Sequence, residues 1–80
     1  MQHYTSYPLP RSLVTTLIIN GATRSFEGDL DLNQLLESLS LAGKKLAIER
    51  NGELVPRSQY ADCEIADGDR LEIVMAVGGG

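Results

Sequence analysis

The sequence predicts an α+β fold in which a mixed β-sheet packs on one main helix. Two Asn-Gly dipeptides, at 20–21 and 51–52, each follow a short β-rich run, which is the strongest short-range signal for a tight hairpin turn. Between them, four leucines spaced i, i+3, i+4 and i+7 lie on one helical face: Leu32, Leu35, Leu36 and Leu39. We therefore expect a hairpin on each side of one helix, within the single domain that 80 residues can form.

The first strand is expected at 16–19 and its return strand at 22–26, joined by the first Asn-Gly pair. Residues 1–15 differ in composition, because Pro8 and Pro10 interrupt any period there. We expect them to form a flexible N-terminal extension, with the domain itself covering residues 16–77.

The helix is expected to begin at Asp31, whose carboxylate can accept a hydrogen bond from a free helical N–H. Gln34, three residues later, can reach back to the N-cap backbone and complete a capping box. Gly43 is expected to end the helix as a left-handed cap.

A third strand is expected at 46–50, closed by the second Asn-Gly pair. Leu54 and Val55 then form a short edge segment, since Pro56 cannot donate to a sheet ladder.

The last strand, 70–77, follows the turn at 67–69 and alternates between two faces. The residues expected to face the helix on the first and last strands are Leu17, Ile19, Leu71, Ile73 and Met75. Placed centrally beside the first strand and parallel to it, the last strand completes a β-grasp, the ubiquitin-like fold, because the helix supplies the crossover that parallel pairing requires.

Composition excludes several classes of partner. The net charge of −4 and the pI near 4.7 disfavour binding to nucleic acid, which needs clustered Lys and Arg. No apolar run reaches the roughly 18 residues that span a bilayer, so no membrane association is expected. Cys63 is the only cysteine and cannot form an intrachain disulfide, which favours a reducing cytoplasm.

The side chains offer little material for catalysis, and we expect no metal and no bound cofactor. His3 is the only histidine and lies in the extension, so a hydrolase lacks its usual constellation. Cys63 has no CxxC partner and is expected to be a packing residue. Asp67 and Asp69 lack the other ligands of a calcium loop and are expected to form a turn.

The reactive group is expected at Gly80, preceded by Gly78 and Gly79 in a flexible tail. Glycine has no Cβ, so such a tail can pass through a narrow channel and leave its carboxylate open to attack. A carboxylate is inert until it is activated, for example as an acyl-adenylate, so a partner enzyme would have to supply ATP. An inert tail is the simpler alternative.

Five motifs together resemble the ThiS family of sulfur carriers in thiamine biosynthesis, over about 65 residues from Thr16 onward. They are Leu35-Leu36, Asn51-Gly52, Val55-Pro56-Arg57, Asp67-Gly68-Asp69 and Val77-Gly78-Gly79-Gly80. The resemblance implies that an E1-like adenylyltransferase adenylates Gly80 and that a persulfide sulfur donor converts it to a thiocarboxylate. Thiazole synthase then receives the sulfur, so the chain is a cosubstrate and not an enzyme.

Two departures and two alternatives accompany this resemblance. The N-terminal extension is not shared, and Met75-Ala76 stands where many relatives carry a bulkier residue. The small subunit of molybdopterin synthase shares the glycine tail but commonly has prolines just before it, which are absent here. A ubiquitin-like interaction module without chemistry is the alternative from another class.

The outward face of the sheet is the candidate partner-binding surface. Strand alternation turns Ile18, Val74 and Ala76 away from the helix, where they are expected to form an apolar patch near the tail. Arg57 or Arg70 is expected at its rim.

Overall fold

The structure, a computed structural model, describes residues 14–76 of the 80. Its elements are β1 (Val14–Ile19), β2 (Ala22–Glu27), α1 (Leu32–Ser38), β3 (Leu46–Arg50), β4 (Glu53–Val55), the 3-10 helix η2 (Arg57–Asp62) and β5 (Arg70–Met75). The predictions on residues 1–13 and on the glycine tail lie outside the described residues. Within residues 14–76, no helix is long and apolar enough to cross a membrane.

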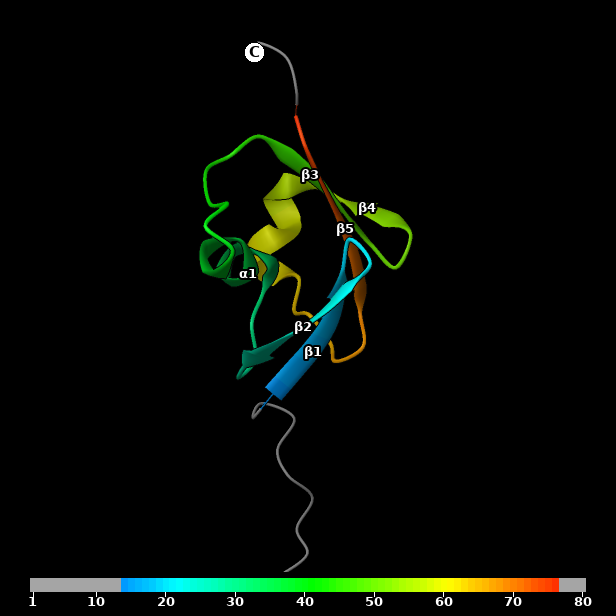
Figure 1. Cartoon of the computed structure of the whole chain (residues 1–80). Coiled ribbons are helices and arrows are strands. Elements are labelled where there is room, and N and C mark those ends of the chain that lie inside the picture. Colours follow the sequence, from blue (N-terminus) through cyan, green and yellow to red (C-terminus); the bar gives the residue numbers. More distant parts are fainter. Residues whose placement is uncertain (1–13, 77–80) are drawn as a thin grey trace, which may run out of the picture.

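The strands form one mixed sheet in the order β2-β1-β5-β3-β4. β5 pairs parallel with β1 and antiparallel with β3, so the last strand in sequence is the central strand of the sheet. α1 and η2 lie on the same side of the sheet (Figure 1). This arrangement confirms the predicted β-grasp.

Both Asn-Gly pairs form the tight turns that the sequence predicts. The φ angles are 50° and 85° at Asn20 and Gly21, and 52° and 89° at Asn51 and Gly52. Two successive positive φ angles match the right-handed twist of the flanking strands, and only Asn, Asp and Gly adopt them readily. The turns therefore fix the β1–β2 and β3–β4 hairpins locally.

The start of α1 is confirmed, whereas its predicted end at Gly43 is wrong. The Gln34 N–H donates to the Asp31 carboxylate at 2.8 Å, and the Asp31 N–H donates to the Gln34 side chain at 2.9 Å. The helix ends at Ser38, because Ser40 takes the left-handed conformation, with φ 61°. The Leu41 N–H then donates to the Leu36 carbonyl at 2.7 Å, which closes a Schellman-type cap three residues before the glycine.

The expected boundary between extension and domain is also wrong, because β1 begins at Val14. Thr15 is buried, and its hydroxyl donates to the Gly28 carbonyl at 2.9 Å. This contact ties the start of β1 to the segment that follows β2.

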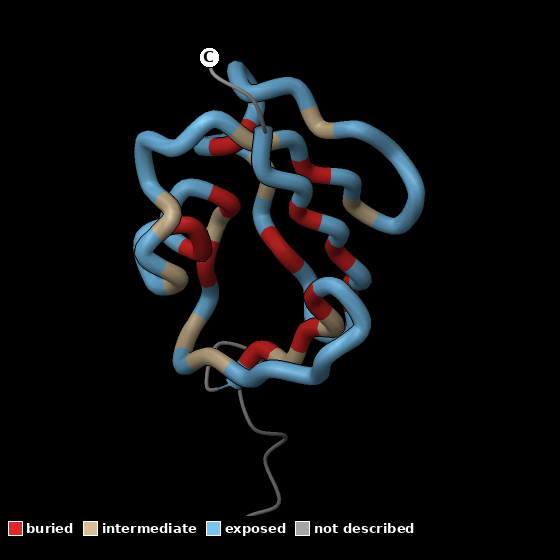
Figure 2. The backbone as a smooth tube through the Cα atoms, turned by 45° about the horizontal axis from the view of Figure 1, so that its top comes forward, coloured by how far each residue is buried: buried red, intermediate tan, exposed pale blue. Residues whose placement is uncertain are grey.

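The core lies between the sheet and the two helices. Buried positions alternate with more exposed ones along β1 and most of β5 (Figure 2), and Leu17, Ile19, Leu71 and Ile73 point inward as predicted. Met75 was expected inside but is 39% exposed. Its cross-strand partner, Leu46, is only partly buried, so the core ends before this last pair of the sheet.

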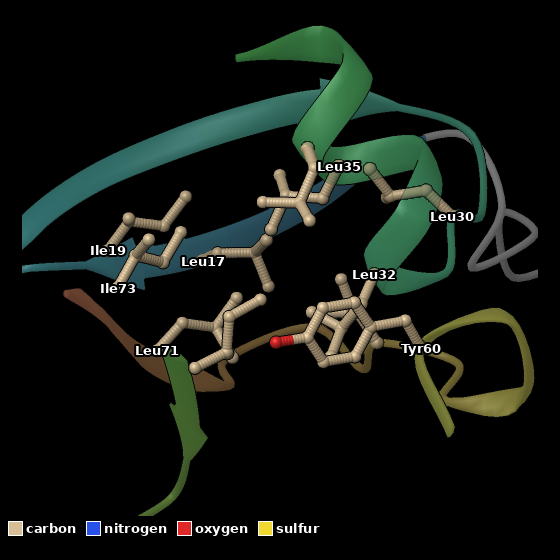
Figure 3. Packing of buried hydrophobic residues seen from close by; sticks show 11 residues of the cluster. Leu17, Ile19, Leu30, Leu32, Leu35, Tyr60, Leu71 and Ile73 are labelled. Carbon is tan, nitrogen blue, oxygen red and sulfur yellow. The ribbon is translucent and has the colours of Figure 1, made fainter. Parts of the chain in front are cut away.

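Tyr60 is a core residue that the periodicity did not predict. It lies in η2, is 3% exposed, and joins the leucines of α1 and the sheet in one cluster (Figure 3). Cys63, just after η2, is partly buried against the same cluster, which confirms its expected packing role.

Candidate functional site

The described part of the candidate site is the end of β5, from which the chain continues toward the glycine tail. Ala76 is the last residue described, so Gly78, Gly79 and Gly80 lie outside the described residues. The described residues include the hydrogen-bond partners of β5 and the surface around its end.

Asn20 forms hydrogen bonds with the edge of β5 that faces β1, at residues where β1 itself no longer pairs with β5. β1 ends at Ile19, beyond which its backbone turns away. The Asn20 side chain then donates from Nδ2 to the Ile73 carbonyl at 3.1 Å and accepts at Oδ1 from the Ile73 N–H at 2.7 Å. Its own N–H donates to the Leu71 carbonyl at 2.9 Å. β5 thus remains hydrogen-bonded on this edge past the end of its parallel partner.

Asn51 holds the other edge at the start of β5. Its N–H donates to the Arg70 carbonyl at 2.8 Å, and its Oδ1 accepts from the Arg70 N–H at 2.9 Å. Its Nδ2 also donates to the Asp69 carboxylate at 3.1 Å. Both hairpin asparagines, predicted only as turn residues, therefore clamp the strand that carries the tail.

Asp69 is the electrostatic anchor of this region. The Arg50 Nε lies 2.7 Å from its carboxylate in an ion pair, and the Ala66 N–H donates to it at 2.9 Å. Burial of the carboxyl, the largest single influence, pushes its pKa upward. The hydrogen bonds from Ala66, Asn51 and Arg50 together outweigh burial and hold the pKa of Asp69 below its ordinary value.

The neighbouring Asp67 confirms its expected role as a turn former. It accepts a hydrogen bond from the Thr16 N–H at 2.6 Å, and the Gly68 N–H donates to the Thr16 carbonyl at 2.7 Å. The turn before β5 is thereby joined to β1.

A shallow hollow surrounds the end of β5, and we call its lining the β5-end surface. It consists of Lys45, Leu46, Ala47, Arg57, Val74, Met75 and Ala76. The Ala76 N–H donates to the Lys45 carbonyl at 2.9 Å, which extends the β3–β5 pairing by one step. Arg57, from the start of η2, donates to the Lys44 carbonyl at 3.0 Å. β3, β5 and η2 thus converge on Ala76, the last residue described.

The structure divides the predicted partner-binding patch into two places. Val74, Ala76 and Arg57 lie together on the β5-end surface, and Val74 is 61% exposed. Ile18, only partly exposed, pairs with Arg70 at the opposite end of β5. Arg70 and Val74 are four positions apart along β5, which corresponds to about 13 Å. The expected single patch with Ile18 is therefore wrong.

Sequence reasoning missed four members of this surface: Lys45, Leu46, Ala47 and Met75. Ala47 is the cross-strand partner of Val74. The alternation of β3 could have predicted that Ala47 faces outward. The register that places Ala47 beside Val74, however, joins strands that are far apart in the sequence. No local pattern encodes that register.

The described titratable side chains do not meet the requirements of a metal site. In the stretch from Val14 to Ala76, no group of three His, Cys, Asp or Glu side chains could hold a metal ion. The thiol of Cys63 accepts only a long contact, 3.9 Å, from the Arg50 guanidinium. Gly80, the reactive group that the sequence predicts, lies outside the described residues.

The comparisons with known proteins agree with the fold. The ThiS family model matches residues 17–80 of the chain. The chain is similar to the sulfur carrier protein ThiS of Bacillus subtilis, with 37% identity over 65 residues that cover 80% of this chain and 98% of that protein. It is also similar to the crystal structure of the thiamine biosynthesis protein (ThiS) from Geobacter metallireducens. That match has a TM-score of 0.71 and 30% identity, and it covers 82% of this chain and all of that one.

Two further relatives are much longer proteins. A thiazole synthase from Paramagnetospirillum magneticum is 47% identical over 64 residues, which cover 80% of this chain and 20% of that protein. The chain spans a similar fraction, 19%, of the thiazole synthase of Magnetococcus marinus. A segment like this chain thus makes up about a fifth of each of these thiazole synthases.

Proposed function

The chain belongs to the ThiS family, and on that premise we propose that it is a sulfur carrier of thiamine biosynthesis. The carboxylate of Gly80 is the group that carries the sulfur, as a thiocarboxylate. The observation that carries this proposal is the family match, which continues through the glycine residues to position 80.

The fold is suited to such a role. β5 is the central strand, bound by β1 and Asn20 on one side and by β3 and Asn51 on the other. A strand held on both edges gives the residues that follow it a fixed starting point. Among residues 14–76, no group of three His, Cys, Asp or Glu side chains could hold a metal ion. The chain is proposed to act as a cosubstrate, with the catalysis supplied by a partner.

The loading chemistry follows from the inertness of a free carboxylate. An E1-like adenylyltransferase binds ATP, the Gly80 carboxylate attacks the α-phosphate, and pyrophosphate leaves. The terminal sulfur of a donor persulfide then attacks the acyl carbon and displaces AMP, which forms an acyl disulfide. A thiol attacks the donor sulfur of this disulfide, forms a new disulfide with it and releases the thiocarboxylate. The carrier itself binds no cofactor, and ATP is consumed by the activating partner.

Thiazole synthase is the proposed acceptor of the sulfur. Two relatives named thiazole synthase include a segment similar to this chain. A shared polypeptide keeps a carrier at high effective concentration beside the enzyme that it supplies. That advantage supports a direct transfer between the two, which we place in the cytoplasm.

Reconstitution tests the proposal. Thiazole synthase, its other substrates, the adenylyltransferase, ATP and a donor persulfide labelled with heavy sulfur are combined with and without the chain. We expect labelled thiazole only when the chain is present. A parallel mixture contains the large subunit of molybdopterin synthase and its substrate in place of thiazole synthase and its substrates. Label in the product of that mixture alone would assign the chain to the other carrier class, and label in neither product would favour an inert interaction module.

A further inference from the structure

Positive charge is concentrated at one end of an otherwise acidic molecule. The chain has a net charge of −4, yet three of its seven Lys and Arg residues, Lys44, Lys45 and Arg57, lie at or beside the β5-end surface. All three are exposed, and the Arg57 guanidinium lies 3.0 Å from the Lys44 carbonyl. Among the described residues that line this hollow, none is acidic.

The cations surround an apolar floor. Val74 and Met75 are 61% and 39% exposed, and Ala47 lies directly opposite Val74 across the β3–β5 ladder. Exposed apolar side chains rimmed by polar groups are typical of protein interfaces. The hollow is open and shallow, whereas small-molecule sites are clefts that enclose most of the ligand.

The charge changes sign along the same two strands. Glu49 and Glu72 lie directly opposite each other, one step along the outward face from Ala47 and Val74. Both are exposed, and like charges in this position destabilise a sheet. The outward face is thus basic near Ala76 and acidic farther along the strands. This difference in charge can fix the orientation in which a partner binds.

We infer that the β5-end surface docks thiazole synthase, on a partner surface that is apolar at its centre and carries carboxylates opposite Lys45 and Arg57. The inference rests on the proposed carrier function and adds which face is recognised and by what charge. Gly80 follows Ala76 by four residues, so its carboxylate lies no more than about 14 Å from the docked surface. Complementary charge around Ala76 would therefore bring the tail, and no other end of the molecule, to the partner's reaction centre.

A second copy of the chain fits this surface poorly. A two-fold dimer places the same patch on both protomers, so Lys45 and Arg57 would face the cations of the other copy. An acidic partner surface removes that repulsion.

The test compares one charge reversal at this surface with the same reversal elsewhere. Lys45→Glu is the test variant, since the hydrogen bond between Lys45 and Ala76 uses only the backbone carbonyl of Lys45. Arg70→Glu is the matched control, because Arg70 is an exposed cation at the far end of β5. Both variants have the same net charge, and thermal unfolding of each checks the fold.

The dissociation constant for purified thiazole synthase is measured for each variant at two salt concentrations. We expect Lys45→Glu to weaken binding about tenfold at ~0.1 M salt, and Arg70→Glu less than about twofold. At ~1 M salt, where the Debye length falls from about 10 Å to about 3 Å, the tenfold difference should shrink below about threefold.

Two outcomes overturn the inference: equal weakening by the two variants, or binding of Lys45→Glu to thiazole synthase that matches wild type. The gain of sulfur at Gly80 is measured on the same samples with excess adenylyltransferase. Wild-type chain that gains no sulfur contradicts the carrier function. Wild-type chain that loads normally while Lys45→Glu binds thiazole synthase like wild type contradicts only the docking surface.

Discussion

Replacement of Asn20 by glycine tests how the central strand is held. Glycine accepts the positive φ of 50° at this position, so Asn20→Gly removes the side chain without straining the backbone. The change deletes the two hydrogen bonds, 3.1 and 2.7 Å long, between the carboxamide and the Ile73 backbone.

The expected loss follows from those bonds. Each contributes a net of about 0.5–1.5 kcal/mol, so the free energy of unfolding should fall by about 2 kcal/mol. The greater freedom of glycine in the unfolded chain and the relief of a left-handed asparagine are each of order 1 kcal/mol and oppose each other. For a domain of this size, the change lowers Tm by about 8–16 °C.

Urea unfolding gives the free energy, and hydrogen exchange reports the Ile73 amide directly. The matched control is Ser40→Gly, which also replaces an exposed residue with positive φ, 61°, and has no recorded side-chain hydrogen bond. We expect the control to change stability by less than about 0.5 kcal/mol. If Asn20→Gly behaves like the control and the Ile73 amide stays protected, the asparagine clamp is refuted.

Three further predictions concern the anchor, the surface and the tail. Because the folded pKa of Asp69 is depressed, its contribution to stability is complete above the unfolded pKa near 3.9 and is lost as the pH falls through the folded pKa. Asp69→Asn should therefore show a shallower fall of Tm than wild type below about pH 4, and parallel curves would contradict this. Val74→Asp should lower the free energy of unfolding by less than about 1 kcal/mol, since Val74 is 61% exposed, but weaken binding to thiazole synthase by roughly tenfold in titration calorimetry; unchanged binding would eliminate Val74 from the interface. Deletion of Gly80 should abolish sulfur transfer and leave the urea midpoint unchanged, and a deleted chain that still transfers sulfur would exclude Gly80 as the carrier.

The sequence predicts the parts of this fold that short-range physics controls. The turns at 20–21 and 51–52 need residues that tolerate positive φ, and the capping box needs Asp31 and Gln34 three residues apart. Alternation likewise places Leu71 and Ile73 inside. Each of these rules involves neighbours within a few residues, so a single sequence carries it.

The errors arise where distant segments meet or where a less common residue takes a role. Ser40 ends α1 in a conformation that usually selects glycine, so the pattern pointed to Gly43. η2 is too short to show a period, which hid Tyr60. The pairing of Ile18 with Arg70 joins residues that are far apart in the chain, so Ile18 was assigned to the wrong end of the candidate surface.

The intact mass of the chain after incubation with ATP, the adenylyltransferase and a persulfide donor decides the central claim. The account predicts a gain equal to one sulfur atom minus one oxygen atom, located by fragmentation on Gly80. An unchanged mass beside an adenylyltransferase that is active on another carrier, or a gain located on Cys63, would contradict it.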